Sequence, residues 1–112
     1  MLDLSNLEVC KTRFQKFKGL MFSKKKNLLF VLDKEERFSA GIHMLFVFYP
    51  IKVIWLDSKF KIVDLAKLRP FIGFHVPMKK ARYILEISVK PSTKSKEEFK
   101  IGEVLDLERF LR

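Results

Sequence analysis

The sequence predicts a mainly β, mostly antiparallel fold with at least six strands and less helix than strand. Its apolar residues fall into short runs separated by turn signals, which is the pattern of an all-β domain. Its 112 residues suffice for one domain, and the 48% that are hydrophobic can build one core. We therefore expect a single domain over residues 1–112.

Three segments in the first half have strand patterns. Residues 8–14 alternate between two faces, and residues 28–32 form an apolar run that the charged turn 33–37 is expected to end. Residues 42–48 are almost continuously apolar, so we expect both faces of that strand to be covered.

In the second half of the chain, the sequence predicts a hairpin and the strand with the clearest alternation. Residues 53–56 and 60–65 flank the turn 57–59, and residues 69–78 read as a surface loop because they contain two prolines and a glycine. The strand 83–89 alternates, with Tyr83, Leu85, Ile87 and Val89 on one face and Ile84, Glu86 and Ser88 on the other.

Helix is expected only as short pieces, in residues 14–21, 92–98 and 106–112. The expected core residues share a position inside a predicted strand and apolar neighbours. They are Phe30, Met44, Phe46, Phe48, Ile54, Ile62, Leu85 and Ile87.

The positive charge is concentrated in two segments. The chain has 23 Lys and Arg against 13 Asp and Glu, a net charge of +10, yet residues 9–32 and 65–85 contain no acid at all. An RNA- or DNA-binding surface built from segments 11–26 and 67–82 is therefore the alternative function. Its residues would be Lys11, Arg13, Lys24, Lys25, Lys26, Lys79, Lys80 and Arg82. The favoured interpretation is that these cations keep a Phe-rich domain soluble, because no nucleic-acid motif accompanies them.

Read in order, six short pieces of the chain resemble the domain-of-unknown-function family one hundred and ninety-two. They are 19–22 (GLMF), 29–31 (LFV), 43–44 (HM), 50–57 (PIKVIWLD), 81–86 (ARYILE) and 101–103 (IGE). The resemblance implies a small antiparallel β-barrel or jelly-roll-like sandwich with one or two short helices, and it brings no established activity.

Two departures from that family concern its most polar positions. Many members have Trp-Met-Lys-Asn-Thr where this chain has 43–47 (HMLFV), and Asp where it has Lys52. A ligand proposed for those polar members is therefore not carried over to this chain.

No catalytic or metal-binding motif stands out. The two histidines have Asp57, Asp64 and Glu86 as candidate partners, but none of the usual metal-ligand spacings is present. Cys10 reads as a small buried thiol. We expect no catalytic residues, no metal and no cofactor, although an enzyme that uses these carboxylates and histidines is a further, less favoured hypothesis.

The favoured function is a non-catalytic binding module with a partly apolar pocket or groove. The candidate ligand-binding residues are His43, Trp55, Arg69, His75 and Tyr83. The expected partner is a small molecule or a protein of unknown identity, and the oligomeric state stays open.

The sequence also predicts a location. No apolar run approaches the roughly 18 residues that a membrane span needs, and the first residues do not form a signal peptide, so we expect a cytoplasmic protein with no membrane partner. Scarce Asn and Gln beside abundant Lys is a composition reported for hyperthermophile proteins.

Overall fold

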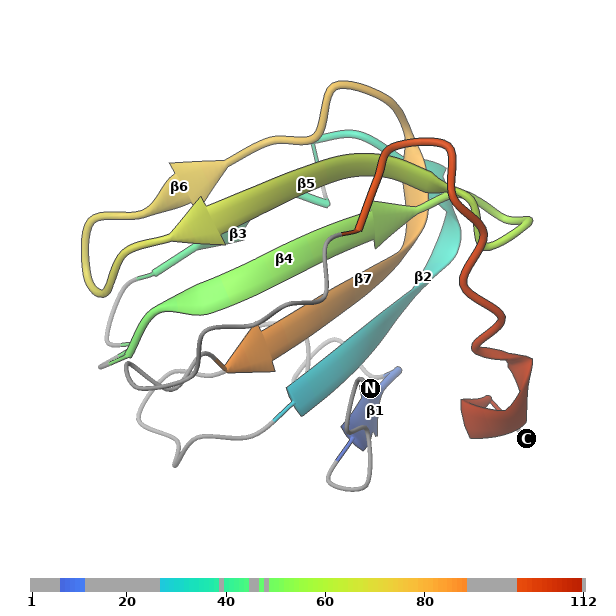
Figure 1. Cartoon of the computed structure of the whole chain (residues 1–112), viewed down its shortest axis with the longest axis horizontal. Coiled ribbons are helices and arrows are strands. Elements are labelled where there is room, and N and C mark those ends of the chain that lie inside the picture. Colours follow the sequence, from blue (N-terminus) through green and yellow to red (C-terminus); the bar gives the residue numbers. More distant parts are fainter. Residues whose placement is uncertain are drawn as a thin grey trace.

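In the described part of the chain, the regular structure consists of seven strands and one short helical turn (Figure 1). The computed structural model describes residues 7–11, 27–38, 40–44, 47, 49–88 and 99–111. In order, the elements are β1 (Leu7–Cys10), β2 (Asn27–Glu36), β3 (Ile42–His43), β4 (Ile51–Leu56), β5 (Ile62–Leu68), β6 (Phe74–His75), β7 (Ala81–Ser88) and the 3-10 turn η1 (Glu108–Phe110). The prediction of a mainly β fold is confirmed.

Five of the strands form one sheet in the order β1-β2-β7-β4-β5, and β3 and β6 form a separate two-stranded ribbon. The pairing of β1 with β2 is parallel, and the other pairings are antiparallel. The main sheet is open, so the expected closure into a barrel is wrong. One reason is that the beginning of β5 is already paired with the C-terminal segment: Ile62 N–H donates to the Glu103 carbonyl over 2.8 Å, and Leu105 N–H donates to the Phe60 carbonyl over 2.9 Å.

The register divides the sheet into two faces, each with its own core. On the first face, one row of neighbours across the sheet runs Cys10, Phe30, Ile84, Trp55 and Asp64. On the second face, a row runs Val9, Leu29, Leu85, Ile54 and Leu65. Directly opposite residues point to the same side of a sheet, so these rows place Trp55 and Leu85 in different cores.

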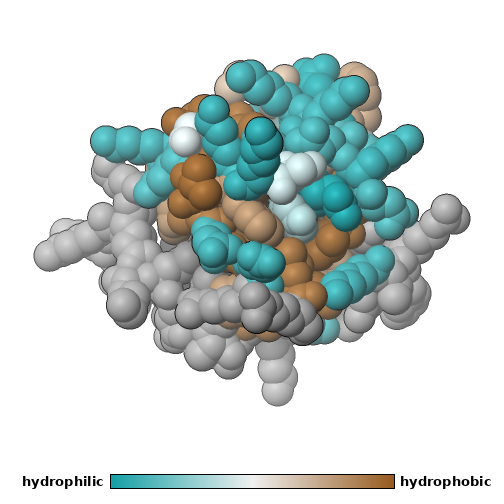
Figure 2. Space-filling view, turned by 90° about the vertical axis from the view of Figure 1, so that its right-hand side faces the viewer, coloured by the Kyte–Doolittle hydropathy of each residue, from teal (hydrophilic) through white to brown (hydrophobic). Residues whose placement is uncertain are grey.

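Different segments cover the two faces. The first face packs against Ala40, Ile42, Met44, Val47 and Tyr49. The second face packs against C-terminal residues such as Leu107 and Phe110. The molecule seen from the right-hand side of Figure 1 shows hydrophobic residues between hydrophilic ones (Figure 2). This agrees with the many second-face residues that are only partly buried.

The core prediction is confirmed at five positions, which are Phe30, Met44, Ile54, Ile62 and Leu85. Ile87 is only half-buried, because it lies near the end of β7 opposite the charged Lys52. Phe46 and Phe48 lie outside the described residues. The predicted faces of the strand 83–89 are confirmed as far as Ile87, and Cys10 is buried as expected.

Three strand boundaries were predicted wrongly. The charged residues 33–36 continue β2 instead of ending it, because pairing with β7 resumes at Glu36 and Ala81 after an irregularity. The long strand expected over 42–48 is reduced to Ile42–His43, since Val47 N–H donates to the Met44 carbonyl and forms a turn. The loop 69–78 contains the short strand β6.

The predicted hairpin and the predicted C-terminal helical turn are confirmed. The hairpin is present, and the Asp57 carboxylate holds its turn by accepting the N–H groups of Lys59 and Lys61. The C-terminal helical turn is η1. The pieces 14–21 and 92–98 lie outside the described residues.

Glu86 is an acid inside the first-face core. It lies in β7 between Leu28 of β2 and Val53 of β4, and only 4% of its surface is exposed. Burial disfavours the charged form of a carboxyl group and raises the pKa of Glu86 to about 8. The folded protein therefore holds Glu86 protonated at neutral pH.

Replacing Leu85 with Ala should lower the free energy of unfolding by about 2–5 kcal/mol, because it leaves a cavity in the second core. Val104→Ala, at a side chain that is 61% exposed, is the control and should change it by less than about 0.5 kcal/mol. Chemical denaturation of the two variants measures the difference. Equal effects would mean that the inward face of β7 is assigned wrongly.

Glu86→Gln should remove a loss of stability at rising pH. Between the usual glutamate pKa of 4.5 and the folded value of about 8, the folded chain keeps a proton that the unfolded chain releases. Stability therefore falls as the pH rises through this window, by up to about 1.4 kcal/mol per pH unit. The neutral Gln variant lacks this fall, so its advantage over the wild type should grow from pH 5 to pH 8 in thermal unfolding. A difference in stability between the variant and the wild type that stays constant from pH 5 to pH 8 would contradict a protonated Glu86.

Candidate functional site

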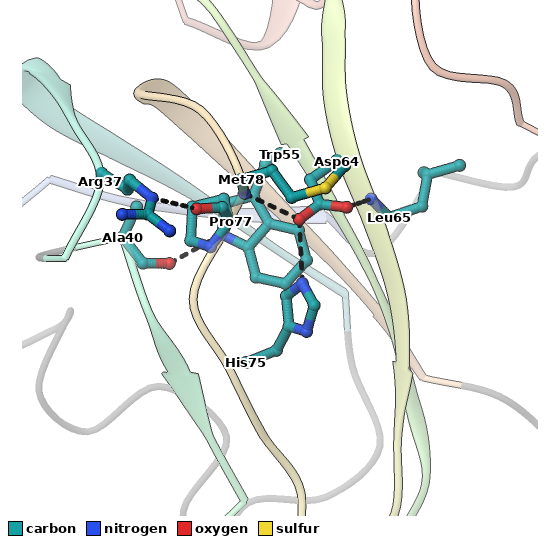
Figure 3. A network of polar contacts seen from close by, with 8 residues as sticks. All are labelled: Arg37, Ala40, Trp55, Asp64, Leu65, His75, Pro77 and Met78. Carbon is teal, nitrogen blue, oxygen red and sulfur yellow. Dashed lines mark hydrogen bonds and ion pairs between the residues drawn. The ribbon is translucent and has the colours of Figure 1, made fainter.

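The carboxylate of Asp64 joins three parts of the chain. Asp64 lies in β5 and is 4% exposed. Its Oδ1 accepts the N–H of Leu65 over 2.8 Å, and its Oδ2 accepts both the N–H of Met78 over 3.0 Å and the Nε2–H of His75 over 2.9 Å (Figure 3). This carboxylate therefore ties β6 and the segment after it to β5.

Asp64 stays ionised in spite of its burial. Burial by itself raises its pKa, but the hydrogen bonds from His75, Leu65 and Met78 and the charge that His75 carries when protonated lower it. Together they hold the pKa of Asp64 below its ordinary value of 3.8. An anionic carboxylate at this position is a hydrogen-bond acceptor only, and this determines what His75 must do.

His75 is oriented by Asp64 and by Trp55. Because Nε2 donates to the carboxylate, a neutral His75 carries its proton on Nε2 and presents Nδ1 as an acceptor. The imidazole lies beside the Trp55 indole, with ring centroids 5.0 Å apart. The side chain is 35% exposed, and none of the described residues forms a hydrogen bond with Nδ1. The ring is therefore held through Nε2, and Nδ1 has no hydrogen bond to the described residues.

Trp55 in turn is fixed by the turn before β3. It is fully buried, and its Nε1–H donates to the Ala40 carbonyl over 2.7 Å. The same turn is held to the segment after β6 by Arg37, whose Nε donates to the Pro77 carbonyl over 2.9 Å (Figure 3). His75 therefore lies on a frame of long-range hydrogen bonds, which keeps its acceptor in one place.

Few chemically reactive groups lie close to His75 in the described part of the chain. The single cysteine of the chain, Cys10, lies in the same row as Asp64 but four strands away, about 19 Å at the usual strand spacing. Within the described part of the chain no three His, Cys, Asp or Glu side chains cluster as metal ligands would. The geometry supports recognition of a hydrogen-bond donor better than nucleophilic chemistry.

The structure brings together two of the five predicted ligand-binding residues, Trp55 and His75. Arg69 is exposed in the loop that leads to His75. Tyr83 does not join them: it lies on the second face, stacked on Phe60 with ring centroids 4.7 Å apart. The backbone of His43 pairs with Phe74, next to His75, and its side chain lies outside the described part of the structure.

The predicted nucleic-acid residues are only partly described. Arg13, Lys24, Lys25 and Lys26 lie outside the described residues. Lys11, Lys79 and Lys80 are exposed, whereas Arg82 is half-buried and donates its Nε–H to the Leu32 carbonyl. The strand that separates Lys11 from the start of β7 is β2, which carries Asp33, Glu35 and Glu36 at this end. Acidic side chains of β2 therefore lie between Lys11 and the cations near the start of β7.

Asp64 was one of three candidate partners for the histidines, and it is the one that binds His75. The sequence signal was a carboxylate inside the apolar run 62–66. The partners supplied by the main chain, the N–H of Met78 and the Ala40 carbonyl, have no sequence signal. The described residues also include no helix long and apolar enough to span a membrane.

Asp64→Asn should lower the free energy of unfolding by about 1–3 kcal/mol at pH 7, because the amide cannot accept all three donors. The folded pKa of Asp64 is depressed, so its contribution is present above the usual value of 3.8 and is lost as the pH falls through the folded pKa. The gap between wild type and variant should therefore narrow in acid.

Urea denaturation at pH 7 and pH 3 measures this gap. His75→Ala is the matched control, since it removes one donor and keeps the two N–H groups on Asp64. A D64N variant as stable as the wild type at pH 7 would rule out a stabilising carboxylate.

Relatives of this chain come from heat-loving archaea. Similar sequences are a UPF0127 protein of Thermococcus sibiricus, 42% identical over 85 residues that cover 74% of this chain and 54% of that protein, and one of Pyrococcus furiosus, 45% identical over 73 residues that cover 64% and 62%. This chain spans little more than half the length of the first of these curated relatives. Their sources fit the composition noted above.

Two solved structures share the fold. One is a protein of unknown function from Novosphingobium aromaticivorans, with a TM-score of 0.65 and 19% identity, covering 73% of this chain and 61% of that one. The other, titled a putative transcription regulator from Sinorhizobium meliloti, has a TM-score of 0.65 and 17% identity, covering 73% and 67%. At this identity the likeness concerns the fold alone.

The family resemblance is confirmed by a match over nearly the whole chain. The model of the family DUF192, described as Uncharacterized ACR, matches residues 3–106. The segments that suggested the family include the strands β4 and β7 at the centre of the sheet. The chain therefore belongs to the DUF192 family.

Proposed function

We propose that this protein is a non-catalytic binding module whose ligand contacts the open edge of His75. The observation that carries the proposal is the fixed imidazole, held through Nε2 by a buried carboxylate, with Nδ1 as its remaining acceptor. Of the residues considered from sequence, His75 and Trp55 remain in the proposed site, and Asp64 joins them.

The chemistry of the ligand follows from the surroundings of His75. Met78 shares the Asp64 oxygen with His75, and its side chain is 62% exposed. A partly apolar ligand can contact such a surface while one hydroxyl or N–H group donates to Nδ1. Because the Trp55 ring is fully buried, it supports the imidazole without touching the ligand.

Paired probes test the site directly. Indole and N-methylindole have similar apolar surfaces, but only indole can donate a hydrogen bond to Nδ1. In NMR titrations of ¹⁵N-histidine-labelled protein, indole should shift the Nδ1 resonance of His75 and bind about five- to tenfold more tightly than its methylated partner, as one hydrogen bond would give. Raising the salt concentration should change this affinity little, because no phosphate contact is involved.

Two variants distinguish this site from the other possibilities. His75→Ala should abolish the preference for indole, while Tyr83→Phe on the second face should keep it. No shift at His75 with either probe, or an indole preference that survives in His75→Ala, would overturn the proposal. Salt-sensitive retention on RNA that the double variant K79E/K80E loses would favour the nucleic-acid function instead.

A further inference from the structure

Large apolar side chains are exposed along the outer ribbon formed by β3, β6 and their flanking turns. Phe38 is 77% exposed, Ile72 75%, Phe74 67%, Met78 62% and Phe71 49%. We call these five residues the apolar stripe. Summed over the five side chains, the exposed apolar surface is on the order of 500 Å², and exposed apolar surface on one side of a protein is often functional.

The tip of the stripe is held in a defined shape. Phe71 adopts a left-handed conformation with φ of 66°, which is unusual for a bulky side chain, and its N–H donates to the Met44 carbonyl over 3.1 Å. Gly73 closes the turn onto the Arg69 carbonyl, and a Cβ there would meet the Met44 side chain at 2.7 Å. The loop therefore presents Phe71 and Ile72 to solvent from a packed base.

Cations flank the stripe at both ends. Arg69 precedes its tip, Lys79 and Lys80 follow Met78, and all three are exposed. Residues 65–82 contain no acid. Figure 1 shows β6 at the outer side of the molecule, with the connection to β7 running on from it. A partner that meets this surface must accept apolar side chains and carry negative charge.

We propose that the apolar stripe docks the protein on an anionic lipid surface. Apolar side chains that project from turns enter the boundary between lipid headgroups and acyl chains, and flanking Lys and Arg bind the anionic headgroups. This association needs no membrane-spanning segment, but it departs from the expectation, drawn from the sequence, that the protein has no membrane partner. A second copy of this chain is disfavoured as the occupant, because its net charge of +10 would repel the same cations.

Vesicle sedimentation tests the proposal. The protein should sediment with phosphatidylcholine vesicles that contain about 30% phosphatidylglycerol and not with pure phosphatidylcholine, and binding should weaken as salt rises. The double variant F71N/I72S should bind at least about tenfold more weakly because it removes the inserting tip. Asn is chosen for position 71 because it tolerates the left-handed conformation.

The matched control is I101S/V104S, which removes two exposed apolar side chains away from the stripe and should leave binding unchanged. Thermal unfolding of each variant shows whether it is folded. Equal binding to both vesicle types, no binding to either, or full binding by F71N/I72S would overturn the proposal. If an acidic amphipathic peptide shifts the stripe amides while vesicles do not, the occupant is a protein and the lipid proposal is wrong.

Discussion

The buried carboxylate of Asp64 is the contact on which the outer part of this molecule depends. The main sheet is held by its ladders, but β6 is only two residues long and shares its ribbon with an equally short β3. Such a ribbon is too short to be stable alone. Asp64 binds it to β5 through the His75 side chain and the Met78 backbone. These two hydrogen bonds, together with the one from the Leu65 N–H, keep the acid ionised, so the positions of the ribbon and of the imidazole have one electrostatic origin.

The two buried acids on the first face have opposite protonation states for a physical reason. Asp64 has three donors on its carboxylate, and they outweigh the effect of burial on its pKa. For Glu86, burial in the apolar layer between Leu28 and Val53 is what shifts the pKa upward. Asp64 therefore favours folding above its acid pKa, and Glu86 disfavours it as the pH rises toward 8. Together they favour greatest stability in mildly acidic solution.

Lys52 lies away from the proposed site. Lys52 is on β4 opposite Lys67 and Ile87, on the second face, and its Nζ is 5.2 Å from the centre of the Phe99 ring. The Asp64–His75 pair belongs to the first face. The charge of Lys52 is therefore on the opposite side of the sheet from the imidazole.

The sequence by itself determined the fold class, the hairpin after β4, the two faces of β7 and five of the eight core positions. These features follow from local alternation and turn residues, which act over a few neighbours along the chain. It also pointed to Trp55 and His75. It misjudged the ends of β2 and β3, since those ends depend on partners in β7 and in the turn at Met44. The separation of Tyr83 from Trp55, the choice of Asp64 as the partner of His75 and the outward presentation of the apolar stripe were decided only by tertiary structure. Each depends on which strands are neighbours and in what register, and long-range pairing of this kind leaves no local pattern in the sequence.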